Sequence, residues 1–431
     1  MSKTSPVPRL QKLALISVHT SPLETPGIGD AGGMNVYIDK TARELAKRGI
    51  EIDIFTRATS KDQPTSIEVT PGVNVRYIPA GPFGGLQKQD LPGQLCAMTA
   101  GVMRAEAEKP EGYYDLIHSH YWLSGQVGWL ARDKWQVPLI HTMHTMAKVK
   151  NLALAEDDSP EPLIRVVGEE QVVKVADRLV ANTHREAAEL IDLYDAPPQK
   201  VDVVHPGVDL EIFTPQGRTL RTELGIEDHD FVLLFVGRIQ PLKAPDIVLK
   251  AASELKARYP ELAHRIRVVI CGGFSGTGTE AKYSLTALAS DLQLHDNVIF
   301  LQPLPPVELA ALYRSADLLV VPSYSESFGL VALEASASGT PVIAAAVGGL
   351  VTSVKDGTSG ALIGNHDPVA WAEKIADVAL NPELHKTLRT GGIDHAKKFS
   401  WQITAQHLID SYERSIFDFR RTSSETNSAS A

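Results

Sequence analysis

The stretch KLALISVHTSPLETPGIGDAGGMNVYIDKTARELAKRGIEIDIFTR at residues 12–57 decides the fold. It opens and closes with short apolar runs, at 12–19 and 50–57, and between them lies an amphipathic stretch at 34–48 that ends at Gly49. Glycine commonly follows the last turn of a helix, because it adopts the left-handed conformation there without strain. Strand, helix and strand in this order predict a βαβ unit, the building block of a parallel sheet.

The same alternation continues along the chain and is interrupted once, at the Gly- and Pro-containing stretch 207–220. Further strand-like runs lie at 114–120, 138–144, 178–183 and 200–207 before this break, and at 231–239, 267–273, 297–303, 317–323 and 341–347 after it. The pattern predicts an α/β fold of two doubly wound, Rossmann-like domains joined by a linker.

These patterns divide the chain into five expected segments. A polar N-terminus and a tail of small polar residues have little to bury and are expected to be disordered, whereas the amphipathic stretch ITAQHLIDSYERSIFDF predicts a long helix. The expected segments are a disordered N-terminus at 1–11, an N-terminal domain at 12–212, a C-terminal domain at 213–400, a helix at 401–420 that packs back toward the N-terminal domain, and a disordered tail at 421–431.

Bulk properties narrow the class of protein. A chain of 431 residues exceeds the usual size of a single hydrophobic core. Its formal net charge of −10 argues against nucleic acid as a partner, and the apolar run LALIS is too short to cross a membrane or to form a signal-peptide core. Cys96 and Cys271 lack metal-type spacing, so we expect two buried, reduced thiols and a cytoplasmic location.

The loop between the first predicted strand and helix carries four glycines, which let the backbone approach a ligand while the helix N-terminus faces phosphate. A nicotinamide dehydrogenase is the obvious competitor. However, the loop is not GxGxxG, and the second strand ends in Thr56 and Arg57 rather than in an acidic ribose-binding residue. The loop therefore predicts phosphate binding of another kind.

The second half carries a combination of charged residues that suits transfer of a sugar from a diphosphate. Arg238 and Lys243 follow a predicted strand, where two cations could neutralise a departing diphosphate. Glu326 and Glu334 bracket a predicted helix start with seven residues between them, and carboxylates can orient sugar and ribose hydroxyls. Either pair alone could be an ordinary surface pair; their joint appearance beside Gly-rich motifs favours glycosyl transfer.

At these residues the sequence resembles the large retaining glycosyltransferase family that includes sucrose synthases and bacterial mannosyl- and N-acetylglucosaminyltransferases. Its hallmark Glu-x7-Glu element is matched by Glu326 and Glu334, and its cation pair by Arg238 and Lys243. The resemblance spans about residues 12–415. It implies the GT-B fold, in which two Rossmann-like domains face each other across a cleft that holds the active site.

Within this family, the motifs GDAGGMNVYI, HSHYWLSGQVGWL, HTMHTMAKVKN and SYSESFGLVALEASASGTPVIAA look closest to actinobacterial inositol-phosphate glycosyltransferases. That resemblance implies transfer of N-acetylglucosamine from UDP-N-acetylglucosamine to 1D-myo-inositol 3-phosphate. It also implies that the anomeric configuration is retained and that this transfer is the first step of mycothiol biosynthesis. A homodimer is implied as well.

The resemblance also implies individual roles. Glu334 would bind the ribose, Glu326 would lie near the donor sugar, Gly33 would approach the diphosphate, Leu304 would read uracil through its backbone, and His144 would contact the sugar. The implied catalytic residues are His144, Arg238, Lys243 and Glu326. The implied donor-binding residues are Thr25, Pro26, Gly33, Arg238, Lys243, Leu304, Glu326 and Glu334. The implied acceptor-binding residues are His19, Asp30, Ala31, Gly32, Gly33, Met34, Asn35, Lys88, Tyr121, Thr145 and Arg165.

A magnesium position is part of the family pattern, and it matches Tyr313, Arg314, Ala316 and Thr340. Backbone oxygens rather than a carboxylate cluster would have to hold that ion, so we expect it to be structural at most. No cofactor is expected for the chemistry, because two cations can stabilise departing UDP without a metal.

Retention without an assignable second carboxylate predicts substitution on the same face of the sugar, rather than double displacement through a covalent intermediate. Two alternatives stay open. The chain could be another transferase of the same fold, such as a sucrose-phosphate synthase or a mannosyltransferase, or an inactive regulator that binds sugar nucleotides.

Overall fold

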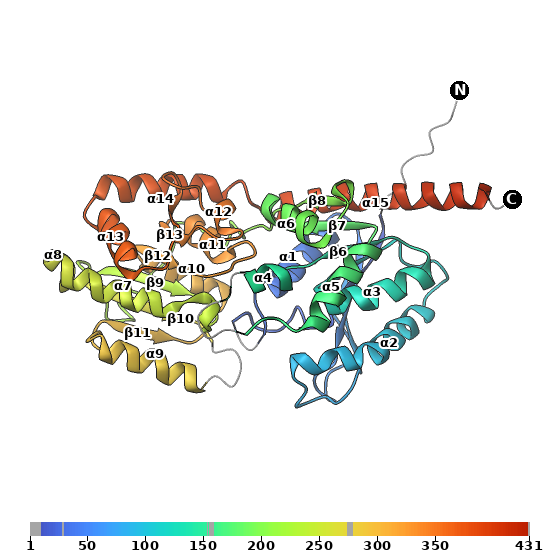
Figure 1. Cartoon of the computed structure of the whole chain (residues 1–431), viewed down its shortest axis with the longest axis horizontal. Coiled ribbons are helices and arrows are strands. Elements are labelled where there is room, and N and C mark those ends of the chain that lie inside the picture. Colours follow the sequence, from blue (N-terminus) through green and yellow to red (C-terminus); the bar gives the residue numbers. More distant parts are fainter. Residues whose placement is uncertain (1–9, 28–29, 153, 155–158, 274–278, 430–431) are drawn as a thin grey trace, which may run out of the picture.

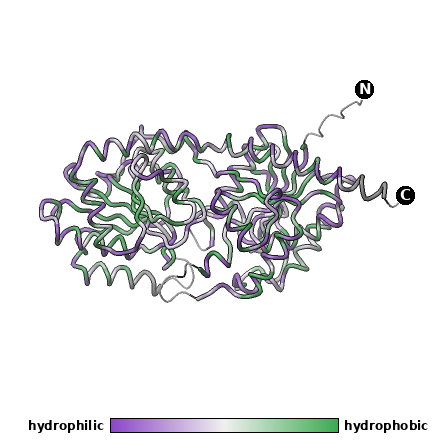
Figure 2. Tube along the Cα trace, turned by 45° about the horizontal axis from the view of Figure 1, so that its top comes forward, coloured by the Kyte–Doolittle hydropathy of each residue, from purple (hydrophilic) through white to green (hydrophobic). Residues whose placement is uncertain are grey.

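Each half of the chain builds its own open sheet, and the two halves lie side by side (Figure 1). The computed structural model describes residues 10–27, 30–152, 154, 159–273 and 279–429. Figure 2 shows the apolar segments gathered inside both halves and hydrophilic segments along the outer helices. The two-domain α/β architecture predicted from the alternating pattern is therefore confirmed.

The first sheet has eight strands in the order β3-β4-β2-β1-β5-β6-β7-β8. Every neighbouring pair is parallel except β3 with β4. The strands are β1 (Lys12–Ile16), β2 (Glu51–Arg57), β3 (Ser66–Thr70), β4 (Val73–Ile78), β5 (Leu116–His120), β6 (Leu139–Thr142), β7 (Arg178–Ala181) and β8 (Val201–Val203).

Helices cover both faces of this sheet, because its buried strands need apolar cover on each side. On α1, Ile38, Ala42 and Leu45 recur at helical spacing and are completely buried. The helices are α1 (Gly33–Ala46), α2 (Leu95–Ala107), α3 (Trp122–Trp135), α4 (Ala147–Leu152), α5 (Leu163–Val175) and α6 (His184–Tyr194), with short 3-10 turns η1 (Lys88–Gln94) and η2 (Pro198–Lys200).

The second sheet has six parallel strands in the order β11-β10-β9-β12-β13-β14. Its strands are β9 (Phe231–Val236), β10 (Ile266–Cys271), β11 (Val298–Leu301), β12 (Leu318–Val321), β13 (Val342–Ala345) and β14 (Gly360–Ile363). Around it lie η3 (Pro241–Lys243), α7 (Pro245–Arg258), α8 (Pro260–Ala263), α9 (Thr279–Asp291), α10 (Pro306–Ser315), α11 (Leu330–Ala337), α12 (Leu350–Ser353), α13 (Pro368–Ala379) and α14 (Pro382–Ala396).

Each sheet reverses its strand order at one point. In the first sheet β1 is followed by β2 on one side and later by β5 on the other, and in the second sheet β9 is flanked in the same way by β10 and β12. Ligands of open α/β sheets bind beyond the carboxyl ends of strands at such a reversal. The loops after β1, β5, β9 and β12 are therefore the places to look for a site.

The last helix, α15 (Trp401–Ala429), returns to the first half of the molecule and packs beside α1 (Figure 1). Trp401, Leu408 and Tyr412 from this helix are buried in the core of the N-terminal domain. The helix differs from the sequence prediction at its end, because it continues to Ala429 instead of becoming disordered after residue 420. No proline or glycine interrupts residues 421–429, so the backbone can continue the helix begun by the packed part.

The cysteine prediction is half wrong. Cys271 is buried at the end of β10, but Cys96 is exposed. On α2 the buried residues are Met98 and Val102, four positions apart, so Cys96 falls on the other side of the helix. Among the described residues no helix is both long and apolar enough to cross a membrane. A cytoplasmic location stays a prediction.

Candidate active site

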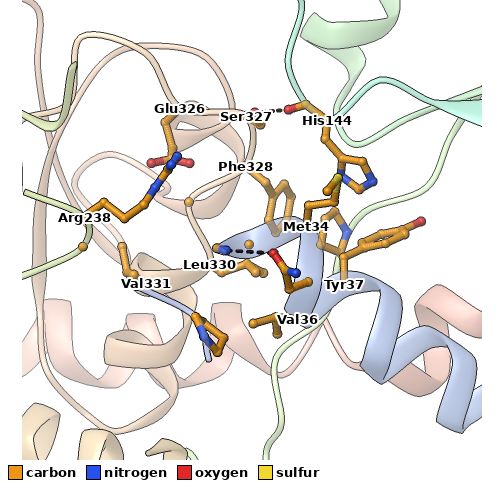
Figure 3. A pocket seen from close by; sticks show the side chains of 18 of the residues that line it. Met34, Val36, Tyr37, His144, Arg238, Glu326, Ser327, Phe328, Leu330 and Val331 are labelled. Carbon is orange, nitrogen blue, oxygen red and sulfur yellow. Dashed lines mark hydrogen bonds between the residues drawn. The ribbon is translucent and has the colours of Figure 1, made fainter. Parts of the chain in front are cut away.

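A large cavity of about 1020 Å³ lies between the two halves of the molecule. Its walls come from the loops that follow β1, β6, β9 and β12 and from the first turns of α1 and α11. In Figure 3, Met34, Tyr37 and His144 approach from the N-terminal half, and Arg238 and Glu326 from the C-terminal half. Both strand reversals thus open into one shared space.

The C-terminal wall carries the predicted cations and carboxylates. Arg238 follows β9, Lys243 ends the turn η3, and Glu326 lies in the loop after β12. The Lys243 ammonium forms an ion pair with the Glu326 carboxylate, and its Nζ lies 3.4 Å from the backbone oxygen of Ser325. The fold therefore brings these three residues to one wall, as the strand-end argument predicted.

Glu334 lies one turn into α11 and also lines the cavity. Its carboxylate accepts a hydrogen bond of 2.9 Å from the hydroxyl of the fully buried Tyr313. Desolvation by the surrounding protein raises the pKa of Glu334 to about 7, although the hydrogen bond from Tyr313 lowers it. Tyr313 thus holds in place a carboxylate whose charge is marginal at neutral pH.

The glycine-rich loop forms the facing wall. Asn35 holds this loop in shape, because its side-chain oxygen accepts from the Gly32 amide at 2.9 Å and its amide donates to Thr20 and to the backbone of Ser21. Gly33 packs so that an added Cβ would stand 3.6 Å from a Leu330 methyl group of the other half. The predicted residues Thr25, Pro26, Asp30, Met34 and Leu304 line the same cavity.

Two positions in this region require glycine. Gly27 has a φ of +88°, and an added Cβ at Gly273 would lie 2.1 Å from the Gly27 carbonyl oxygen. The backbones of the two halves therefore meet at this point. Ala31 differs from its prediction as a binding residue: it is completely buried, and its carbonyl accepts the amide of Gly27, so it shapes the loop from behind.

Three predicted acceptor residues converge on the ring of a fourth, Tyr121, at the N-terminal end of the cavity. The Lys88 ammonium and the Arg165 guanidinium lie 5.0 and 5.1 Å from the centre of the Tyr121 ring, which His19 meets edge-on. Arg165 donates to the Thr145 hydroxyl at 2.9 Å. Two cations and two hydroxyls beside one cavity wall can bind a phosphate group.

The surrounding protein shifts the pKa values of two groups in this corner. Burial, aided by the nearby Lys88, lowers the pKa of His19 to about 3, so this ring is neutral although it lies 3.2 Å from Asp30. The surrounding protein also lowers the pKa of Lys88 to about 8, against the attraction of Asp30. Asp30 in turn stands 3.9 Å from Arg238 across the cleft.

Sequence reasoning missed the carboxylates that hold Arg165. Its guanidinium binds Glu161 at 2.8 Å and the fully buried Glu169 at 2.7 Å. Glu161 also pairs with Lys150, a further cation on the cavity wall. Their spacing of four residues on either side of Arg165 was the available signal, because residues four apart on a helix face each other.

His144 occupies a strained position between the two halves. Its φ is +60°, which is uncommon for a residue other than glycine, and burial lowers the pKa of its imidazole to about 3. Its backbone oxygen accepts a hydrogen bond from the Ser327 hydroxyl of the C-terminal half (Figure 3). Ser327 was not singled out from the sequence, since a serine in a loop carries no specific signal.

Hydrogen bonds already engage the backbone at the predicted magnesium position, and a structural magnesium ion there stays a prediction. The Tyr313 carbonyl already accepts hydrogen bonds from the Thr340 hydroxyl at 2.5 Å and from the Ala316 amide at 3.0 Å, and the Arg314 guanidinium donates to the backbone oxygens of Arg218 and Thr214. Mg²⁺ is usually held by carboxylates and waters in octahedral geometry. Across the described parts of the chain, no group of three or more His, Cys, Asp or Glu residues could hold a metal.

The fold and the site together define a glycosyltransferase of the GT-B class. Residues 32–207 match the family model described as "Glycosyl transferase 4-like domain", and residues 217–395 match "Glycosyl transferases group 1". The sucrose-phosphate synthase of Thermosynechococcus elongatus superposes with a TM-score of 0.85 at 31% identity, over 94% of this chain and 98% of that one. Anabaena HepE, solved with UDP and glucose, shares the fold at 20% identity and a TM-score of 0.73, over 93% of this chain and 99% of that one.

Curated relatives define the family more narrowly. The D-inositol 3-phosphate glycosyltransferase of Salinispora arenicola is 56% identical over 97% of this chain and 95% of its own length. That of Thermobispora bispora is 56% identical over 96% of this chain and 97% of its own length. The chain belongs to the family of the D-inositol 3-phosphate glycosyltransferases.

The raised pKa of Glu334 can be tested directly. We expect its carboxyl group to titrate near pH 7 in ¹³C NMR, because the surrounding protein disfavours the charge. Tyr313→Phe should raise this pKa further, since it removes the hydrogen bond to the carboxylate. Tyr77→Phe, which removes a hydroxyl near Ser21 instead, should leave it unchanged. A midpoint between pH 4 and 5 in the unmodified protein would contradict the assignment.

Proposed function

We propose that the protein transfers N-acetylglucosamine from UDP-N-acetylglucosamine to 1D-myo-inositol 3-phosphate with retention, the first step of mycothiol biosynthesis. The observation that carries the acceptor is that Lys88 and Arg165 meet over the Tyr121 ring and that Arg165 also binds the Thr145 hydroxyl, which gives one cavity corner the donors that a phosphate needs. The 56% identical relatives are D-inositol 3-phosphate glycosyltransferases, which supports the same acceptor.

The donor would lie against the C-terminal wall. Arg238 and Lys243 would bind the diphosphate, and Glu326, held by Lys243, would face the sugar. Glu334 would accept a hydrogen bond from the ribose, and the backbone at Leu304 would read uracil. Such fixed charges stabilise a departing UDP group better than water does, because they need no reorganisation as charge develops.

The proposed chemistry proceeds on one face of the sugar. The bond between the anomeric carbon and the UDP oxygen breaks, and an inositol hydroxyl oxygen forms the new bond on the same face. Its proton passes to the departing β-phosphate oxygen. Arg238 and Lys243 stabilise the developing charge on the diphosphate, so this route needs no carboxylate nucleophile and no metal ion.

A substrate matrix tests this proposal. Turnover is measured by product mass across UDP- and GDP-sugars against inositol, inositol phosphates and hexose phosphates, with and without EDTA. We expect the highest kcat/KM for UDP-N-acetylglucosamine with inositol 3-phosphate, no loss in EDTA, and an α-anomeric product. Preference for hexose phosphate or GDP-mannose would favour the two rival transferases, and failure of repeated turnover would favour the inactive regulator.

Lys88 gives the acceptor site a pH dependence. Because its pKa is lowered to about 8, Lys88 loses its charge above that pH, and the KM for inositol 3-phosphate should rise. Lys88→Arg stays charged and should flatten this rise. At pH 7, Lys88→Ala should raise the acceptor KM by about 10- to 100-fold, the value of a hydrogen bond to a charged group. The exposed control Lys374→Ala should change neither KM, and an effect of Lys88→Ala confined to the donor KM would refute the assignment.

We further propose that the protein forms a homodimer through α5. Leu163, Ile164 and Val167 form an exposed apolar row on this helix, 75, 59 and 43% exposed, and a second copy would remove them from water. Sedimentation should show a dimer that Ile164→Glu dissociates. Leu380→Glu, at an exposed apolar residue of the C-terminal half, should leave it intact. A monomer at micromolar concentration would contradict this proposal.

A further inference from the structure

Buried histidines gather beneath the sugar side of the cavity. His118 and His120 lie two residues apart on β5 and therefore face the same side of the sheet, while His144 follows the neighbouring strand β6. His118 and His120 are each 1% exposed. Burial lowers the pKa of all three imidazoles, so they are neutral rings inside the protein.

These rings form a continuous line of contacts from the last helix to the cavity. The hydroxyl of Tyr412 on α15 lies 2.7 Å from His118 Nδ1, and the Thr142 hydroxyl lies 2.9 Å from His118 Nε2. The His118 and His120 rings pack with their centres 4.2 Å apart. His120 Nδ1 then lies 2.9 Å from His144 Nε2, which completes the line.

The packing around this line leaves little freedom. The ring of Tyr37 on α1 meets His120 and His144 edge-on, with centres 5.8 and 5.2 Å away, and meets Trp401 of α15 at 6.0 Å. Trp401 of α15 is therefore connected to the His144 ring through Tyr37, and Tyr412 of α15 through His118 and His120. Because the backbone of His144 is left-handed, contacts of this kind are needed to hold its side chain in one orientation.

The hydrogen-bond partners of His120 determine which ring carries the proton between His120 and His144. A single hydrogen must lie between two neutral nitrogens that are 2.9 Å apart. Among the residues that the structure describes, the buried His120 Nε2 has no hydrogen-bond partner, and an orphaned N–H is rarer in proteins than an orphaned acceptor. His120 Nε2 is therefore bare, and His120 carries its proton on Nδ1 and donates it to His144 Nε2. The proton of His144 must then lie on Nδ1, the ring nitrogen left for a ligand.

We propose that His120 is a positioning residue that fixes the orientation and tautomer of His144, and that α15 supports it through Tyr412 and His118. His144 would thereby present an Nδ1–H donor to a hydroxyl of the donor sugar. This inference rests on the proposed function, because it takes the donor sugar from there, and it uses the contact between His144 and the sugar that the family resemblance implies.

His141 provides a matched control for the test. It is a fully buried histidine on β6, and burial lowers the pKa of its imidazole to about 3. However, it bonds to the Ser119 hydroxyl and to the sulfur of Met143 instead of joining the line. His141→Leu should therefore match His120→Leu in its structural damage, measured as Tm, without disturbing the ring of His144.

Steady-state kinetics with UDP-N-acetylglucosamine and inositol 3-phosphate test the proposal. His120→Leu should lower kcat by about 10- to 100-fold, the range for losing a residue that orients a functional histidine, with little change in either KM. His120→Asn keeps an amide donor near the position of Nδ1 and should recover most of kcat. Tyr412→Phe, which removes only a hydroxyl, should give a smaller loss of kcat, and His141→Leu should give none.

Nitrogen NMR of the histidine rings supplies the second readout. His144 should carry its proton on Nδ1 in the unmodified protein and lose that preference in His120→Leu. A proton on Nε2, or a kcat loss no greater than that of His141→Leu at equal Tm, would overturn the proposal. If His144→Ala itself left kcat unchanged, the proposed sugar contact would fail and this inference with it. An impaired His144→Ala beside a fully active His120→Leu would remove this inference alone.

Discussion

The parallel direction of the strands is the constraint on which the rest of this molecule depends. In a parallel sheet every strand delivers its carboxyl end to the same edge, and the connecting helices return along the faces. Here two such sheets turn those edges toward one another. Residues from loops more than two hundred positions apart, such as Asp30 and Arg238, consequently share one cavity. A cleft of this kind can bind two substrates from opposite sides.

Charge balance is the second organising feature. Three of the cations assigned to the substrates already have an acidic partner within the chain: Lys243 has Glu326, Arg165 has Glu161 and Glu169, and Arg238 has Asp30 at longer range. A buried cation without a partner would be costly, so these carboxylates keep the positive charges in place. Phosphate groups that enter the cavity would bind to cations whose positions the carboxylates already fix.

Specific contacts between the two halves lie beside the site. The Ser327 hydroxyl binds the His144 carbonyl, and the backbones of Gly27 and Gly273 meet where a side chain would not fit. The long helix α15 links the halves covalently, because it follows the C-terminal half in sequence and buries Trp401 and Tyr412 in the N-terminal half. Contacts of this kind tie the orientation of His144 to the relative placement of both halves.

The sequence by itself determined the class of fold, the break between the halves and the residues at the strand ends. Those features depend on local periodicity and on glycine, cation and carboxylate spacing, as Lys243, Glu326 and the βα alternation show. Only the tertiary structure decided which groups meet. The Tyr412–His118–His120 line, the burial that shifts Glu334, and the engaged carbonyl of Tyr313 all depend on contacts between distant segments. Spacing along one chain determines which face a residue occupies, whereas burial and hydrogen-bond partners depend on what the rest of the fold packs against that face.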